Sequence, residues 1–93
     1  MSLHEQYKHI RDLPGLGPKS EAQLKTIGIQ SLKAFVVADP YELYGELKLH
    51  YPDISLNFLY AMIGAQELTD WKQIAQTRKM EILLRLDDLG LAP

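Results

Sequence analysis

Apolar residues recur along this chain at intervals of three or four positions, a spacing that places side chains on one face of an α-helix. The clearest stripe consists of Leu56, Leu59, Tyr60 and Ile63. Phe35-Val36-Val37 is the only stretch with the composition of a strand, and it lies within a helical pattern. The sequence therefore predicts an all-α fold, a compact bundle of five or six short helices.

Capping residues and helix breakers set the expected limits of these helices. Helices are predicted over residues 4–12, 18–27, 32–38 and 40–50, a fifth after Ser55, and a last segment from Thr69 or Asp70 to Gly90. Ser31, Asp39 and Ser55 are expected to act as N-caps. The last segment is predicted to break near Gln76-Thr77, where Thr77 would cap a fresh start.

The 93 residues fit one domain, because domains typically have about 100–150 residues. The absence of Cys excludes disulfides, thiolate zinc sites and Cys nucleophiles. No stretch reaches the ~20 apolar residues of a membrane span, and no export signal begins the chain, so we expect a cytoplasmic protein without a membrane partner. We assign no function to residues 1–3, because Met-Ser-Leu is also the form that a cloning remnant would take.

Charge is unevenly distributed between the two parts of the chain. The net charge is −2 and the pI about 5.8, whereas domains that bind nucleic acid by bulk electrostatics usually have a pI above ~9. Residues 1–33 carry five Lys or Arg against three acidic residues, and residues 34–93 carry five against nine. An anion-binding surface is therefore expected in the first third of the chain.

The most informative stretch is the hairpin, residues 14–20, which follows the first predicted helix and includes the start of the second. Its two glycines permit a tight reversal of the backbone. The main-chain amides then lie beside a helix N-terminus, whose unpaired donors and partial positive charge suit a phosphate. The candidate nucleic-acid-binding residues are Pro14, Gly15, Leu16, Gly17, Lys19 and Ser20. The alternative is that the glycines only make a tight interhelical turn.

Neighbouring charges modify this interpretation in both directions. Lys8, Arg11 and Lys25 would widen a basic rim around the hairpin. Glu21 complements the helix dipole, and its charge would repel an approaching phosphate. Lys19 stands where that dipole disfavours a cation, which mildly favours an anionic partner.

A patch of small residues, Ala61, Gly64 and Ala65, lies on the fifth predicted helix. Glycine within a helix costs about 1 kcal/mol relative to alanine, so a close approach of another segment is expected there. That approach is either internal or the seam of a homodimer. Tyr60 and Trp71 lie on apolar stripes and are interpreted as core residues rather than stacking platforms.

No combination of residues indicates catalysis. The three histidines lack ligand-like spacing, so we expect no metal and no cofactor. Neither Ser20 nor Ser55 has the His and acid pattern of a nucleophile, and Gly15-Leu16-Gly17 is too short for a nucleotide-binding loop. We therefore predict that the protein is not an enzyme.

Residues 9–24 resemble the helix-hairpin-helix motif, which in many DNA-handling proteins grips backbone phosphate without reading sequence. A wider set of motifs resembles the C-terminal domain of the TfoX/Sxy family over about residues 11–89. These motifs are Leu13-Pro-Gly-Leu-Gly-Pro-Lys-Ser-Glu21, Gly28-Ile-Gln-Ser-Leu32, Ser55-Leu-Asn-Phe-Leu-Tyr-Ala-Met-Ile-Gly-Ala65 and Asp70-Trp71.

This resemblance implies a small all-helical domain associated with the regulation of natural competence and of transcription with it. Larger members carry a separate N-terminal domain that this sequence does not contain, so a standalone domain is expected. Our leading hypothesis is a non-enzymatic regulatory module with weak, sequence-independent binding to DNA backbone through the hairpin. The alternative is a protein-interaction or dimerisation module in which the hairpin is purely structural.

Overall fold

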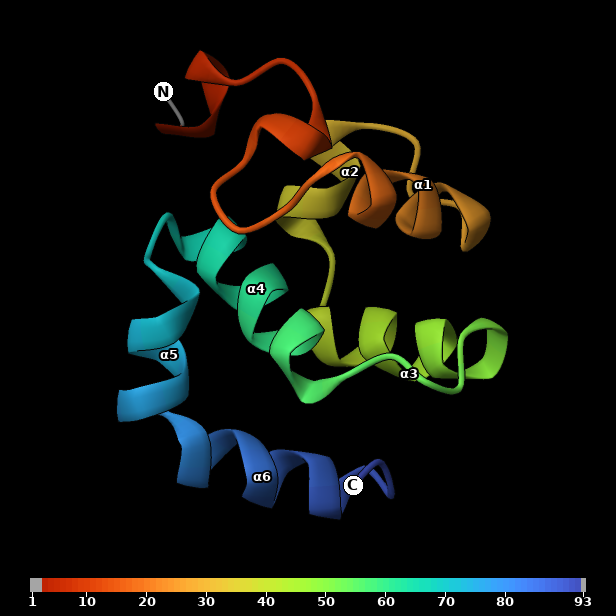
Figure 1. The fold of residues 1–93 in the computed structure, drawn as a ribbon, viewed down its shortest axis with the longest axis vertical. Coiled ribbons are helices and arrows are strands. Elements are labelled where there is room, and N and C mark those ends of the chain that lie inside the picture. The colour runs from red at the N-terminus through yellow and green to blue at the C-terminus, as the bar shows by residue number, and fades with distance from the viewer. Residues whose placement is uncertain (1–2, 93) are drawn as a thin grey trace.

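The computed structural model describes residues 3–92, which are helical over most of their length (Figure 1). The α-helices within this range are α1 (Pro18–Thr26), α2 (Leu32–Val37), α3 (Pro40–His50), α4 (Leu56–Glu67), α5 (Trp71–Thr77) and α6 (Lys79–Asp88). No strand occurs among residues 3–92, so the predicted all-α class is confirmed. Residues 1 and 2 of the Met-Ser-Leu start lie outside the described residues.

The predicted helix over residues 4–12 is wrong. Two short 3-10 turns, η1 (Leu3–Gln6) and η2 (Ile10–Asp12), stand in its place. Only Ile10 is fully buried in this segment, and a helix with so little packing is marginal. In addition, the Asp12 carboxylate accepts a hydrogen bond from the His9 amide at 3.2 Å, which stabilises a local turn instead.

Most of the other predicted boundaries agree with the structure. Ser31 caps α2, because its hydroxyl oxygen accepts a hydrogen bond from the Ala34 amide at 3.1 Å. Asp39 caps α3 in the same way, accepting from the Tyr41 amide at 2.9 Å. Pro18 and Pro40 occupy the first positions of their helices, where the missing N–H costs nothing.

Two predicted caps do not form. Ser55 precedes α4 as expected, but its side chain makes no capping hydrogen bond. Thr77 is the last residue of α5, and its hydroxyl donates to the Gln73 carbonyl at 2.8 Å. The break is nevertheless close to its predicted place, because α6 begins directly after Arg78.

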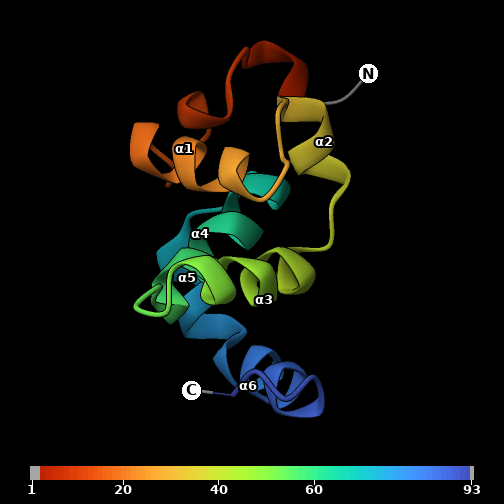
Figure 2. The same ribbon diagram turned by 90° about the vertical axis from the view of Figure 1, so that its right-hand side faces the viewer.

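Helix α4 lies between the two ends of the molecule, with α1 and α2 towards one end and α6 at the other (Figures 1 and 2). Residues 59–65 of α4 are all buried, so burial extends beyond the predicted stripe to every side of this part of the helix. It packs against α2, α3 and α5. The extents of the molecule are 34 × 28 × 19 Å, and the hairpin and α6 lie towards opposite ends of the longest axis (Figure 1).

Candidate functional site

The hairpin begins with a tight turn, which is held in place by a buried leucine on each side. The Leu16 amide donates to the Leu13 carbonyl at 3.1 Å, with Pro14 and Gly15 at the two central positions. Gly15 has a φ of +84°, which makes this a type II turn and requires glycine. Leu13 and Leu16 are buried, so the turn is attached firmly to the core.

The hairpin rests on the junction of α4 and α5. A Cβ atom added to Gly15 would lie 3.4 Å from Cδ1 of Trp71 and 3.8 Å from Cβ of Ala61. The indole of Trp71 is therefore a packing surface for the turn. Trp71 is predicted to be a core residue, but it is only partly buried and packs against the core from outside. Tyr60 is only 4% exposed and is confirmed as a core residue.

The patch of small residues on α4 is also internal. Ala61, Gly64 and Ala65 are buried, and a Cβ on Gly64 would lie 2.5 Å from the Thr69 carbonyl oxygen. The small side chain of Ala61 leaves room for the hairpin, and the lack of a side chain at Gly64 leaves room for the backbone that leads into α5. Of the two alternatives for this patch, the structure shows the internal contact, because other residues of the chain cover these positions.

Gly17 differs from Gly15 in having no structural requirement for glycine. Its φ of −140° and ψ of −173° are extended, and a Cβ added there would meet no atom within 4 Å. Gly17 is the N-cap of α1, and no side chain caps this helix. Among residues 3–92, no hydrogen bond takes up the amides of Gly17, Lys19 or Ser20. The start of α1 therefore presents several open donors beside an unobstructed backbone.

Lys19 is exposed and forms no ion pair within the described part of the chain. Ser20 is half-buried. Both residues line a groove of about 600 Å³ whose opposite wall is formed by the loop between α3 and α4, including Tyr51 and Asp53. The groove is thus mixed in charge, with one cation on the hairpin side and one carboxylate across from it.

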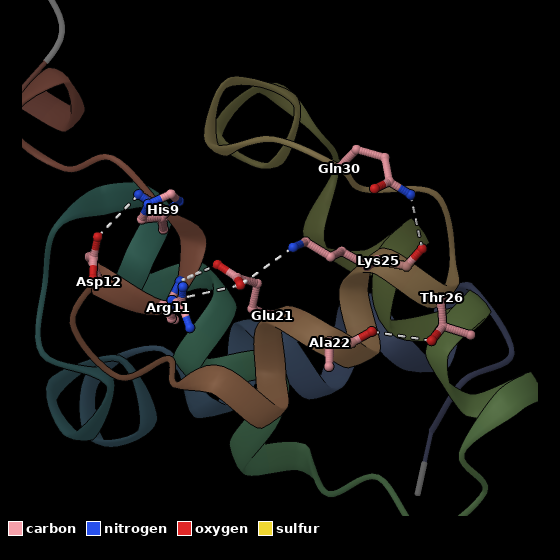
Figure 3. Close-up of polar contacts among 8 residues, drawn as sticks. All are labelled: His9, Arg11, Asp12, Glu21, Ala22, Lys25, Thr26 and Gln30. Carbon is pink, nitrogen blue, oxygen red and sulfur yellow. Dashed lines mark hydrogen bonds and ion pairs between the residues drawn. The ribbon is translucent and has the colours of Figure 1, made fainter.

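Glu21 behaves differently from what its sequence position suggests, because it is almost buried, at 9% exposure. Figure 3 shows its polar contacts with Arg11 and Lys25. Its carboxylate accepts a hydrogen bond from the Arg11 amide at 3.1 Å and joins η2 to α1. Glu21 Oε1 lies 3.8 Å from Arg11 Nε and 3.6 Å from Lys25 Nζ. The hydrogen bond from the Arg11 amide lowers the pKa of Glu21, and the positive charges of Lys25 and Arg11 lower it further. Burial of the carboxylate acts in the opposite direction but does not outweigh them.

These contacts change the predicted basic rim. Arg11 and Lys25 are partly neutralised by Glu21, and Glu21 is turned towards them. Sequence reasoning missed this arrangement. The spacing of Glu21 and Lys25 is that of a helical ion pair, but nothing local indicates that the amide of Arg11 would meet the same carboxylate.

The remaining described residues give no indication of a metal centre, since no group of three or more metal-ligating side chains is found among them. Likewise, no helix within residues 3–92 is long and apolar enough to cross a membrane.

Fold and hairpin together define a class, a small all-helical domain in which a Pro-Gly-Leu-Gly turn leads into an uncapped helix. The model of the family described as TfoX C-terminal domain matches residues 6–86, nearly the whole chain. The chain therefore belongs to the TfoX C-terminal domain family. No curated protein and no solved structure matches the chain.

Proposed function

We propose that this protein is a non-enzymatic regulatory module that contacts nucleic-acid backbone weakly through the hairpin, residues 14–20. Membership of the TfoX C-terminal domain family supports a regulatory role, and the regulation of competence and transcription is the setting in which we place it. The observation that carries the nucleic-acid contact is the set of open amides at Gly17, Lys19 and Ser20.

Three features of the site favour a phosphate. Open N–H groups at a helix N-terminus point outwards, and the helix dipole adds a partial positive charge there. Lys19 supplies a full positive charge that no described carboxylate neutralises. Gly17 leaves the approach to the amides open, since it has no side chain and no neighbour within 4 Å of the missing Cβ.

The expected binding is weak. One hairpin neutralises about two or three phosphates, which corresponds to a Kd of about 10⁻⁴–10⁻⁶ M and a log–log salt slope of roughly −2 to −3. The net charge of −2 opposes bulk attraction to nucleic acid. A second DNA-binding site, on a partner or on another copy of the chain, would then raise the affinity through avidity.

Fluorescence anisotropy of a labelled duplex at low and moderate salt tests this proposal. We expect saturable binding that weakens with salt and nearly vanishes in Lys19→Glu. The matched control is Lys79→Glu, which makes the same change of net charge at the start of α6, at the other end of the molecule. If both variants lose the same amount of duplex affinity, the loss results from the change in net charge, and a binding site at the hairpin is contradicted.

A second substitution tests the amides directly. Serine at Gly17 is a good N-cap, and its hydroxyl would accept hydrogen bonds that the open amides otherwise offer to phosphate. Gly17→Ser is therefore expected to weaken duplex binding. The unfolding free energy is expected to stay unchanged or to rise by about a few tenths of a kcal/mol. Duplex binding as tight as that of the wild type would contradict the role of these donors.

The second candidate is a protein-interaction module in which the hairpin is only structural. The burial of Leu13 and Leu16 and the packing of Gly15 on Trp71 favour it, because the turn has a clear internal role. No duplex binding at tens of micromolar protein in low salt would select this candidate.

A further inference from the structure

A second groove, of about 690 Å³, runs between α3 and the C-terminal end of α6. Its apolar lining includes Leu49, Leu89 and Leu91, and its acidic lining includes Asp39, Glu42 and Glu46. We refer to it as the α3–α6 groove. It lies at the end of the molecule away from the hairpin and shares no lining residue with the candidate phosphate site.

The floor of the groove is a contact between α3 and the end of the chain. Gly45 of α3 has no side chain, and a Cβ there would lie 3.3 Å from Cδ1 of Leu91. Leu91 is half-buried in this position, whereas Leu49 is 83% exposed and Leu89 46% exposed. The groove thus has an anchored apolar floor and two leucines that remain open to solvent along its sides.

The acidic residues form an ordered rim rather than a scattered cluster. Glu42, Glu46 and Leu49 are spaced four and three residues apart on α3, so they share one face of the helix. Neither glutamate takes part in an ion pair within residues 3–92. The one cation of the lining, Arg85, has its guanidinium 5.6 Å from the centre of the Tyr41 ring.

We propose that the α3–α6 groove binds a basic amphipathic helix of a partner protein. Such a helix presents apolar side chains at intervals of three and four residues, which match the exposed leucines, and its Lys or Arg side chains face Glu42 and Glu46. Charge complementarity argues for this occupant, because the groove combines unpaired carboxylates with apolar surface. The inference goes beyond the proposed function, since it rests on different residues and predicts a different ligand.

The test uses a fluorescent synthetic peptide of leucine and lysine arranged as an amphipathic helix, and the same peptide with glutamate in place of lysine. We expect the basic peptide to bind and the acidic peptide not to bind. Leu49→Ser is expected to weaken binding of the basic peptide by about tenfold, as loss of one buried leucine contact implies. The matched control is Val37→Ser, because Val37 is 78% exposed on α2 and does not line the groove.

Reversal of the rim charge makes a second test. The double variant Glu42→Lys and Glu46→Lys is expected to transfer the preference from the basic to the acidic peptide. Equal effects of Leu49→Ser and Val37→Ser, or no preference between the peptides, would overturn the proposal. A dimer in sedimentation experiments that Leu49→Ser dissociates and Val37→Ser does not would also overturn it, because a second copy would then cover the groove.

Duplex binding by the same variants separates this inference from the proposed function. Leu49→Ser is expected to bind the duplex like the wild type, and Lys19→Glu is expected to bind the basic peptide like the wild type. Loss of peptide binding in Lys19→Glu would overturn the assignment to the α3–α6 groove, whatever the result with DNA.

Discussion

Gly64→Ala is the substitution whose outcome follows most directly from the packing. In the middle of a helix, alanine is normally preferred to glycine by about 1 kcal/mol. In this protein the new Cβ would lie 2.5 Å from the Thr69 carbonyl oxygen and 3.2 Å from the Trp71 amide nitrogen. Both neighbours are backbone atoms, so neither can move aside by a side-chain rotation.

The size of the effect depends on how far the turn after α4 can yield. The Thr69 oxygen would have to move by about 0.9 Å, from 2.5 to 3.4 Å, to reach ordinary contact. The turn is already tight, because Leu68 has a φ of +53° and the Thr69 amide donates to the Gly64 carbonyl at 2.8 Å. Overpacking of this kind costs about 1–3 kcal/mol. This cost exceeds the gain of about 1 kcal/mol in helix propensity, except at the lowest value of the range, where the two are equal.

Thermal and urea unfolding measure this difference. The overpacking cost minus the gain in helix propensity is a net loss of up to about 2 kcal/mol, which corresponds to a fall in Tm of up to roughly 15 °C for a domain of this size. Gly45→Ala is the matched control, because Gly45 is also in mid-helix but its new Cβ would meet only the flexible end of Leu91 at 3.3 Å. We expect that variant to be as stable as the wild type or slightly more stable. If Gly64→Ala is no less stable than Gly45→Ala, the reasoning from backbone contact is refuted.

Three further predictions concern single side chains. Gly15→Ala is expected to lower the unfolding free energy in urea by about 1–3 kcal/mol, because alanine is strained at a φ of +84°. The folded-state pKa of Glu21 lies below its ordinary 4.5, so its stabilising contribution is complete above that pH and is lost as the pH falls through the folded-state pKa. Glu21→Gln should therefore flatten the acid dependence of urea unfolding below pH 4.5. Tyr60→Phe is expected to leave Tm unchanged or raise it, since the Tyr60 hydroxyl is buried with no hydrogen-bond partner among residues 3–92.

Sequence reasoning predicted what depends on neighbours along the chain. The caps at Ser31 and Asp39 are hydrogen bonds to amides two or three residues away, and Pro18 marks the start of α1 through its own backbone preference. The burial of Leu59, Tyr60 and Ile63 on α4 follows from their apolar spacing, whereas Leu56, the first residue of that predicted stripe, is half-buried. These features need no knowledge of the tertiary structure, and the predicted all-α class followed from them.

Local signals failed where competing contacts decided the outcome. Residues 4–12 lacked the apolar face that would hold a helix, so they formed two turns instead. At Thr77 the hydroxyl bonds back to the Gln73 carbonyl of the preceding turn, an option that the sequence offers equally well. Ser55 holds its N-cap position without the capping bond.

The candidate sites depended on distant contacts. The sequence by itself determined that the hairpin would turn at Gly15 and lead into a helix at Pro18, because both residues restrict their own backbone. Only the tertiary structure decided that Gly64 accommodates the chain entering α5, that Glu21 meets Arg11, and that Leu91 lies on Gly45. The contacts of Glu21 and Gly45 join residues ten or more positions apart, and those of Gly64 join residues five and seven positions apart across the turn between two helices. The free energy that selects these contacts comes from packing and burial of the whole chain rather than from local preference.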